Sequence, residues 1–189
     1  MTDLSPVTRP GSLPTTKNVG AYQLTVAKPR HILSIACSTQ GREEFGQWLE
    51  TEYGLALPNP GRLAAKDGVT ILSSAQNQWF LEQQGDIAVD LPVVLERALS
   101  GMASVTEQTG GWVRFEINGP SLADLLCRLC PVDPVDMSAD EVARTKIHHI
   151  GCLVWRDEPG LAVLGPRSTA GSLWHALAEA AMSASLQAR

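Results

Sequence analysis

Hydrophobic and polar residues follow two patterns along this chain, the alternation typical of strands and the spacing typical of helices. The same order of these patterns occurs twice. The clearer copy lies in the second half. Val113, Phe115 and Ile117 alternate with polar neighbours, which predicts a strand with one buried face. Gly119-Pro120 ends that strand and opens a helix, because proline fits the first helical turn. Leucines at helical spacing then form one apolar stripe at Leu122, Leu125, Leu126 and Leu129.

The same copy continues with a hairpin and a closing helix. A long strand is expected around Ile147 to Trp155, followed by a turn at residues 157–160 and a returning strand from Leu161 to Leu164. In the closing helix, His175 and Glu179 are four residues apart on a polar face. Its apolar stripe consists of Ala170, Leu173, Trp174, Leu177 and Ala181.

The first half repeats this order less clearly. A short strand at Val105–Glu107 is expected to pair with Val113–Ile117 across Gly110-Gly111. The helix after Asp90 has a regular apolar face made by Leu91, Val94, Leu95, Ala98 and Leu99. The remaining expected elements are a strand at 33–36, a helix at 42–53, and strands at 69–72 and 79–82 joined by a polar turn at Gln76-Asn77.

Two copies of strand, helix, hairpin and helix predict a single internally duplicated α+β domain over residues 21–189, with repeats at approximately 31–100 and 103–183. Neither copy has enough predicted strands to close a sheet alone. We therefore expect the strands to merge into one mostly antiparallel sheet flanked by helices. Residues 1–20 contain three spaced prolines and are expected to form an extended arm, either disordered or laid over a neighbouring subunit.

Composition narrows the possible partners. The formal net charge is −5, and no block of Lys and Arg is present to neutralise phosphates, which disfavours nucleic-acid binding. No run approaches the roughly 18 apolar residues that cross a bilayer. The chain begins without a basic, apolar leader and has four scattered cysteines, which fits a reducing compartment. We expect a cytoplasmic protein without membrane contact.

Two cysteines suggest a metal or redox site. Cys127 and Cys130 are spaced as C-x-x-C, and His148-His149-x-x-Cys152 follows. We expect Cys127 and Cys130 to lie within a helix, and His148 and His149 to point to opposite faces of a strand, which argues against zinc. A redox dithiol normally opens a helix, where the dipole lowers the thiol pKa, whereas this pair closes one. Buried cysteines that pack as small hydrophobic residues are the favoured interpretation.

Other reactive side chains do not combine into a recognisable site. The histidines lack a carboxylate at a spacing that would indicate an orienting partner, apart from Glu179 beside His175. They are His31, His148, His149 and His175. The sequence contains no glycine-rich phosphate loop. The acidic residues Asp133, Asp136, Asp140 and Glu141 are interpreted as a solvated turn or a partner contact. We expect no catalytic, cofactor-binding or metal-ligating residue on this chain.

Five tryptophans remain to be explained. Trp48 and Trp174 fall on apolar helix faces and are expected in the core. Trp79, Trp112 and Trp155 lie in or beside strands, with Trp112 on a charged side. Tryptophan on a polar face is typical of interfaces, and core packing remains equally open for each of the three.

Several short motifs, taken in order, resemble the gamma subunit of bacterial heterotetrameric sarcosine oxidase. They cover roughly the last third of the chain, with a weaker echo at Gln78-Trp79-Phe80-Leu81 and a departure at Ser74-Ala75, where the family more often has Gly-Pro. The motifs are Gly119-Pro120, Leu125-Leu126, Cys130-Pro131-Val132-Asp133, Arg144-Thr145, and Arg167-Ser168 with Ser172-Leu173-Trp174.

The resemblance implies a non-catalytic assembly subunit with alpha, beta and delta partners. The complex oxidises sarcosine to glycine, hydrogen peroxide and formaldehyde or 5,10-methylenetetrahydrofolate. FAD, FMN, NAD, zinc and tetrahydrofolate are then expected on the other subunits. The gamma subunit is similar to the folate-binding domain of aminomethyltransferases, so the alternative is a stand-alone folate-binding protein related to those enzymes.

Overall fold

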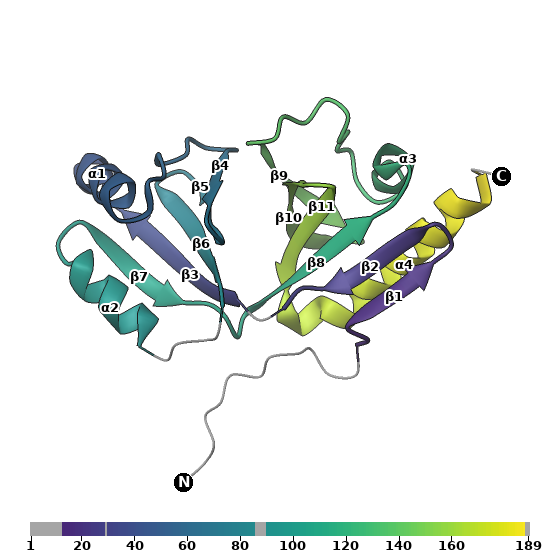
Figure 1. The fold of residues 1–189 in the computed structure, drawn as a ribbon, viewed down its shortest axis with the longest axis horizontal. Helices are drawn as coiled ribbons and strands as arrows, with labels where there is room; N and C mark the ends of the chain where they lie inside the picture. The colour runs from purple at the N-terminus through teal and green to yellow at the C-terminus, as the bar shows by residue number, and fades with distance from the viewer. Residues whose placement is uncertain (1–12, 29, 86–89, 188–189) are drawn as a thin grey trace, which may run out of the picture. The chain divides into compact units, whose positions relative to one another are not determined.

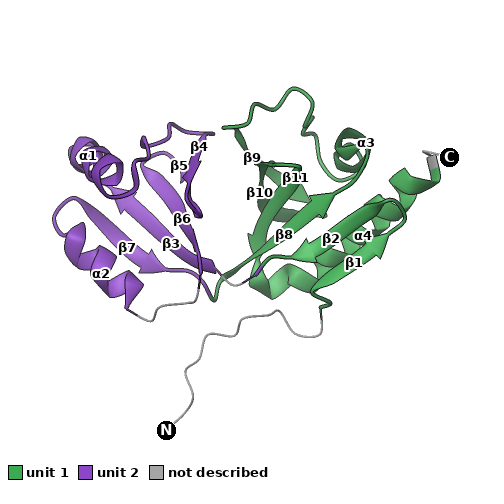
Figure 2. Cartoon of the chain, in the orientation of Figure 1, with its two compact units in different colours: residues 1–27, 110–189 green, residues 28–109 purple. Residues whose placement is uncertain are grey.

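The computed structural model describes residues 13–28, 30–85 and 90–187. Within these residues the chain forms four α-helices, one 3₁₀ helix and eleven β-strands (Figure 1). The fold class is α+β, as predicted. The chain divides into two compact units, unit 1 with residues 1–27 and 110–189 and unit 2 with residues 28–109 (Figure 2).

Unit 2 is built on one antiparallel sheet with the strand order β4-β5-β6-β3-β7. Its core lies between the sheet and two helices: Phe45 and Leu49 pack with Leu95 and with Leu33 and Ile35 of the central strand. The elements are β3 (Arg30–Cys37), α1 (Gly41–Tyr53), β4 (Leu63–Lys66), β5 (Val69–Ala75), β6 (Gln78–Gln84), α2 (Leu91–Ala98) and β7 (Ala103–Glu107).

Unit 1 is built on a second antiparallel sheet with the order β1-β2-β8-β11-β10-β9. The alternating residues Val113, Phe115 and Ile117 share a core with Leu125 and Leu126, as the pattern predicted. The elements are β1 (Thr16–Val19), β2 (Tyr22–Val26), β8 (Trp112–Asn118), α3 (Leu122–Leu126), β9 (Val142–Ile147), β10 (Ile150–Asp157), β11 (Gly160–Pro166), the 3₁₀ helix η1 (Arg167–Thr169) and α4 (Ala170–Gln187).

The expectation of one merged sheet was wrong, because the strands form two separate sheets. The pattern had missed the strand pair at residues 16–26 and the strand at residues 63–66. With these strands and β7, the two sheets have six and five strands. The predicted pairing of residues 105–107 with 113–117 was also wrong, since β7 pairs with β3, while β8 lies between β2 and β11.

The predicted N-terminal arm lies only partly within the described residues. Residues 1–12 fall outside them, and Thr16–Val19 form strand β1 rather than an irregular arm. This strand continues into β2 through a turn at Gly20, whose φ is 59°. The backbone N–H of Ala21 donates to Ser185 Oγ at 2.9 Å, which ties the turn to helix α4.

Candidate functional site

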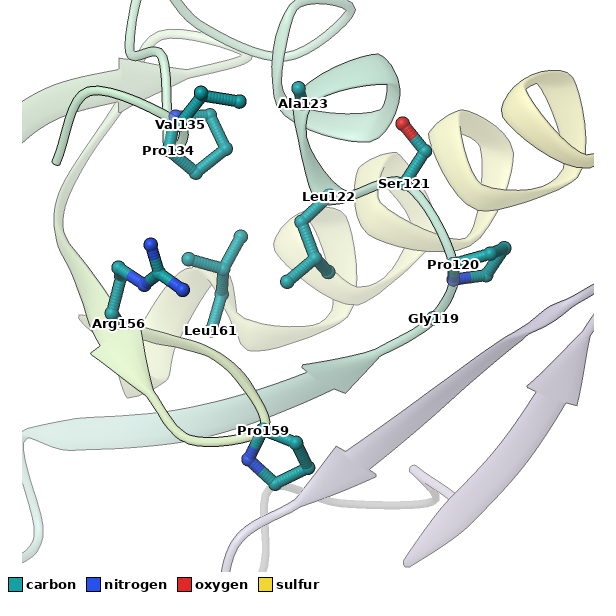
Figure 3. A pocket seen from close by; sticks show the side chains of 10 residues that line it. All are labelled: Gly119, Pro120, Ser121, Leu122, Ala123, Pro134, Val135, Arg156, Pro159 and Leu161. Carbon is teal, nitrogen blue, oxygen red and sulfur yellow. The ribbon is translucent and has the colours of Figure 1, made fainter.

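One concavity of unit 1 lies where β8 turns into α3. It is a hollow of about 400 Å³ that opens on the surface. One side is the segment Gly119–Ala123, and the other comprises Pro134 and Val135 together with Arg156, Pro159 and Leu161 of the β10–β11 hairpin (Figure 3). We call it the α3 hollow.

The Gly119–Ala123 side is fixed by Tyr22 of β2. A Cβ atom at Gly119 would lie 2.1 Å from Cδ1 of Tyr22, so only glycine allows this close approach. The Tyr22 hydroxyl donates to the Ser121 carbonyl oxygen at 2.6 Å. Burial, followed by the nearby Asp124 carboxylate, raises the pKa of Tyr22, so its proton stays in place for this hydrogen bond.

The opposite side contains a loop held by its own acidic side chains. The Val135 N–H donates to Asp133 Oδ1 at 2.9 Å, and the Ser138 hydroxyl donates to Asp140 Oδ1 at 2.8 Å. Pro134 is buried, whereas Val135 is 70% exposed. Asp133 and Asp140 thus accept hydrogen bonds within the turns of this loop.

Arg156 is the charged residue among those that line the hollow. Its Nη2 donates to Glu158 Oε1 at 3.0 Å, and the two side chains are 38% and 69% exposed. An exposed pair of this kind contributes little to stability and exchanges readily. Sequence reasoning missed Arg156, because the hollow is assembled from three separate segments that carry no joint motif.

The residues that line the α3 hollow do not include a nucleophile paired with a base. The Ser121 hydroxyl accepts a hydrogen bond from the Asp124 N–H at 3.4 Å and caps helix α3. The remaining lining residues are Gly, Ala, Val, Leu and Pro together with one guanidinium, and the surface that the hollow exposes is polar as well as apolar. These lining residues offer no group placed for proton transfer.

The C-x-x-C pair lies beside a second hollow of about 380 Å³. Helix α3 ends at Leu126, so the expectation that both cysteines lie within the helix was wrong. Cys127 is its C-cap, and Cys130 comes after the turn at residues 127–129. Cys127 is exposed, whereas Cys130 and Cys152 are buried. Burial raises the pKa of Cys130, and raises that of Cys152 to about 11. In the described part of the chain, no three His, Cys, Asp or Glu residues form a metal-binding group.

The histidines occupy separate places. We expected His148 and His149 to lie within a strand, and this was wrong. They form the two-residue turn between β9 and β10, with φ values of 46° and 69°. His175 and Glu179 form the predicted exposed i, i+4 pair, at 3.2 Å. His31 is buried on β3.

The tryptophans mostly pack within the units. Trp79, Trp155 and Trp174 are buried, and Trp48 and Trp112 are partly buried. The Trp79 indole N–H donates to the Pro58 carbonyl oxygen at 2.9 Å.

The sequence pattern also did not predict that an arginine of β8 is buried. Arg114 is 5% exposed and pairs with Asp157 and, at 3.3 Å, with Glu116. Its guanidinium lies 5.0 Å from the centre of the Trp155 ring. This cluster ties β8 to β10 across β11 and neutralises the buried guanidinium.

The fold has solved counterparts. A chain of the heterotetrameric sarcosine oxidase from Corynebacterium sp. U-96, solved with pyrrole 2-carboxylate, superimposes with a TM-score of 0.74 and 21% identity, covering 90% of this chain and 89% of that one. The chain has the fold of a sarcosine oxidase subunit. At this identity the likeness establishes the fold.

A second counterpart is aminomethyltransferase T of the glycine cleavage system from Bartonella henselae. The TM-score is 0.56 and the identity 13%, over 86% of this chain and 52% of that one. This chain therefore spans about half of the aminomethyltransferase. No family model matches the sequence, and no curated protein matches it. Among the described residues, no helix combines the length and apolar character needed to cross a membrane.

Proposed function

We propose that this chain is the gamma subunit, a non-catalytic assembly subunit, of a heterotetrameric flavin-dependent sarcosine oxidase. The complex would oxidise sarcosine to glycine with release of hydrogen peroxide and of formaldehyde or 5,10-methylenetetrahydrofolate. It would act in the cytoplasm. The alpha, beta and delta subunits would carry FAD, FMN, NAD, zinc and tetrahydrofolate.

Mutual coverage carries this proposal. The likeness spans about nine tenths of both this chain and the oxidase chain, so the two correspond over nearly their whole lengths. The aminomethyltransferase is matched over about half its length. The motifs that resemble the gamma family, from Gly119-Pro120 to Ser172-Leu173-Trp174, all lie in unit 1.

The test is purification of the tagged full-length chain from its native cells under mild conditions. We expect two larger chains and one small chain to co-purify, with visible flavin absorbance and sarcosine-dependent peroxide production in the eluate. The chain expressed alone should be colourless and inactive. A colourless single chain from native cells would contradict the proposal, and tetrahydrofolate binding by that chain would support the stand-alone alternative.

A further inference from the structure

We propose that Cys127 and Cys130 form an oxidation site, at which hydrogen peroxide converts the two thiols into a disulfide across the turn that follows α3. The inference goes beyond the proposed function and does not rest on it, because it concerns two side chains of this chain and an oxidant supplied from solution. In the proposed complex, the same oxidant would be a product of the reaction, so the site would meet it there.

The backbone holds the two cysteines one turn apart. Cys127 has helical φ and ψ values of −58° and −20°, and the Cys130 N–H donates to the Leu126 carbonyl oxygen at 2.9 Å, as it would in a helix. Residues three apart in a helical turn have Cα atoms about 5 Å from each other. A disulfide spans Cα distances of roughly 4.4–6.8 Å. The path of the main chain therefore suits a bond between these two residues.

The two thiols border one space. The sequence suggested two buried cysteines within a helix, but α3 has only five residues and Cys127 is exposed at its end. Cys130 is 8% exposed and belongs to the core of unit 1. Both residues line the hollow of about 380 Å³. Hydrogen peroxide that enters this hollow reaches Cys127 first, and Cys130 borders the same space from the core side.

The surroundings of the two thiols assign them different steps. Arg128 Nη1 lies 3.5 Å from Cys127 Sγ, which places a positive charge beside the sulfur that must be anionic to attack peroxide. Burial raises the pKa of the Cys130 thiol and also shields it from reagents in solution. Cys127 is therefore the thiol that peroxide oxidises, and Cys130 is the thiol that reacts with the product.

The chemistry takes place in two steps. The Cys127 thiolate attacks one oxygen of hydrogen peroxide, the O–O bond breaks, and the sulfur becomes a sulfenic acid while the other oxygen leaves as hydroxide and is protonated to water. The Cys130 sulfur then attacks the sulfenic sulfur, and its proton goes to the departing hydroxyl group, which leaves as water. Two thiols and one peroxide thus give one disulfide and two water molecules. Because the second step joins groups one turn apart, proximity offsets the low reactivity of the buried thiol.

Cys152 is the competing partner for Cys130. It is buried in the same core, and its Sγ donates to the Ile150 carbonyl oxygen at 3.4 Å. Among the described residues, however, those that line the hollow include Cys127 and Cys130 and do not include Cys152. A sulfenic acid formed in the hollow is therefore expected to pair with Cys130, and Cys152 is expected to stay reduced.

The experiment uses the full-length chain as it is purified from its native cells, alone or with bound partners. The sample is treated with hydrogen peroxide at increasing molar ratio, alkylated and digested without reductant. Trypsin cleaves after Arg128, between the two cysteines, so the disulfide joins two peptides that are otherwise separate. We expect mass spectrometry to find this linked pair, lighter by two hydrogen atoms than the two reduced peptides, and to find Cys152 reduced.

Two variants test the order of the steps. In Cys130→Ala the sulfenic acid has no thiol to react with, so trapping of Cys127 by dimedone should rise at least about fivefold over wild type. Cys127→Ala should form no linked pair, and Cys37→Ala in unit 2 is the control that should form it as wild type does. Circular dichroism verifies that each variant is folded.

Three results would overturn the inference. One is oxidation of Cys127 to a sulfinic acid without the linked pair, and another is a disulfide from Cys130 to Cys152 or between Cys127 residues of two chains. The third is formation of the linked pair at the same rate in urea-unfolded chain, which would show that the fold does not build the site. None of these results bears on the proposed function, which is judged by the chains and the flavin that co-purify.

Discussion

At the residue scale, the three cysteines of unit 1 differ in chemistry because their surroundings differ. Cys127 is exposed at the end of α3, whereas Cys130 and Cys152 are buried in the core of unit 1. Burial raises the pKa of both buried thiols, and that of Cys152 to about 11. Thiolate is the reactive form, so the buried cysteines should be almost inert near neutral pH.

We predict that iodoacetamide at pH 8 labels Cys127 much faster than Cys130 or Cys152. With a pKa of about 11, Cys152 would be roughly one thousandth thiolate at that pH, in addition to being sterically shielded. Peptide mapping by mass spectrometry follows the three sites. Protein unfolded in urea serves as the control and should label at all of them, and equal native rates would contradict the burial of Cys152.

The same pKa shift predicts loss of stability at alkaline pH. The unfolded chain releases the Cys152 proton near pH 8.5, whereas the folded chain keeps it to about pH 11. Between these values the folded state binds more protons, so the free energy of unfolding falls as pH rises. The urea midpoint should therefore be lower at pH 10 than at pH 8. In Cys152→Ala this decline should be shallower, and an unchanged decline would assign it to other groups.

Substitutions in the His148-His149 turn are expected to raise the stability of the protein. Both residues have positive φ, a conformation that two-residue hairpins normally assign to an Asn-Gly pair. The double substitution His148→Asn with His149→Gly should therefore raise the free energy of unfolding by about 1 kcal/mol. Chemical denaturation measures the change. Asp67→Asn, in the already favourable Asp67-Gly68 turn, should change stability little.

At the element scale, the β8–α3 junction depends on a contact with a distant strand. Gly119→Ala would place a methyl group against the Tyr22 ring and disturb the hydrogen bond from Tyr22 to Ser121. We expect a loss of about 1–3 kcal/mol in stability, measured by denaturation. Gly171→Ala is the matched control, because its Cβ meets nothing within 4 Å at an exposed position of α4 and should be neutral or slightly stabilising.

The elements themselves were largely predictable where a strong period is present. The alternation at Val113, Phe115 and Ile117 and the leucine pair Leu125-Leu126 both proved to be core. Prediction failed where local chemistry overrides the period. The leucine stripe continues to Leu129, but α3 ends at Leu126 and the chain passes through turns toward Pro131. The apolar run around residues 147–155 concealed a turn, because histidines occupy positions where Asn and Gly normally signal one.

The candidate site was harder to predict from the sequence than the helices and strands. Gly119-Pro120 was recognised as the end of the strand, but Pro120 does not open the helix, which begins at Leu122 after the N-cap Ser121. The other residues of the hollow, Val135 and Arg156, lie far along the chain. Nothing in the spacing of these residues connects them, since the β10–β11 hairpin brings Arg156 into place through sheet register. Only the pairing of strands shows that three short segments share one surface.

At the scale of the whole molecule, the two sheets repeat one plan. Unit 2 orders its strands β4-β5-β6-β3-β7, and unit 1 orders its last strands β9-β10-β11-β8-β2. The internal duplication inferred from the sequence is therefore visible as equivalent sheets. The unexpected part is that β2 precedes β3 in the chain but pairs with β8, whereas β7 precedes β8 but pairs with β3.

This connectivity predicts how a truncated chain behaves. Removal of residues 1–27 deletes β1 and β2, which leaves the β8 edge unpaired and removes contacts of both strands with α4. Hydrogen exchange should show lost protection across residues 110–187 and retained protection across residues 30–85, because unit 2 is continuous in sequence. A chain lacking residues 1–12 serves as the control and should keep both patterns, and protection of residues 110–187 in the longer truncation would contradict the role of β2.

The pairing of β2 with β8 and of β7 with β3 also determines the order in which the two sheets can form during translation. Residues 28–109 leave the exit tunnel as a complete unit, whereas the β1–β2 hairpin emerges earlier and finds its partner β8 only after unit 2 has been made. At roughly 5–20 residues per second, that interval is on the order of ten seconds. During it, the apolar face of β2, with Tyr22, Leu24 and Val26, has no sheet to join. Nascent chains of this protein should therefore be most exposed to chaperones and to misassociation before residues 115–118, which pair with β2, have been translated.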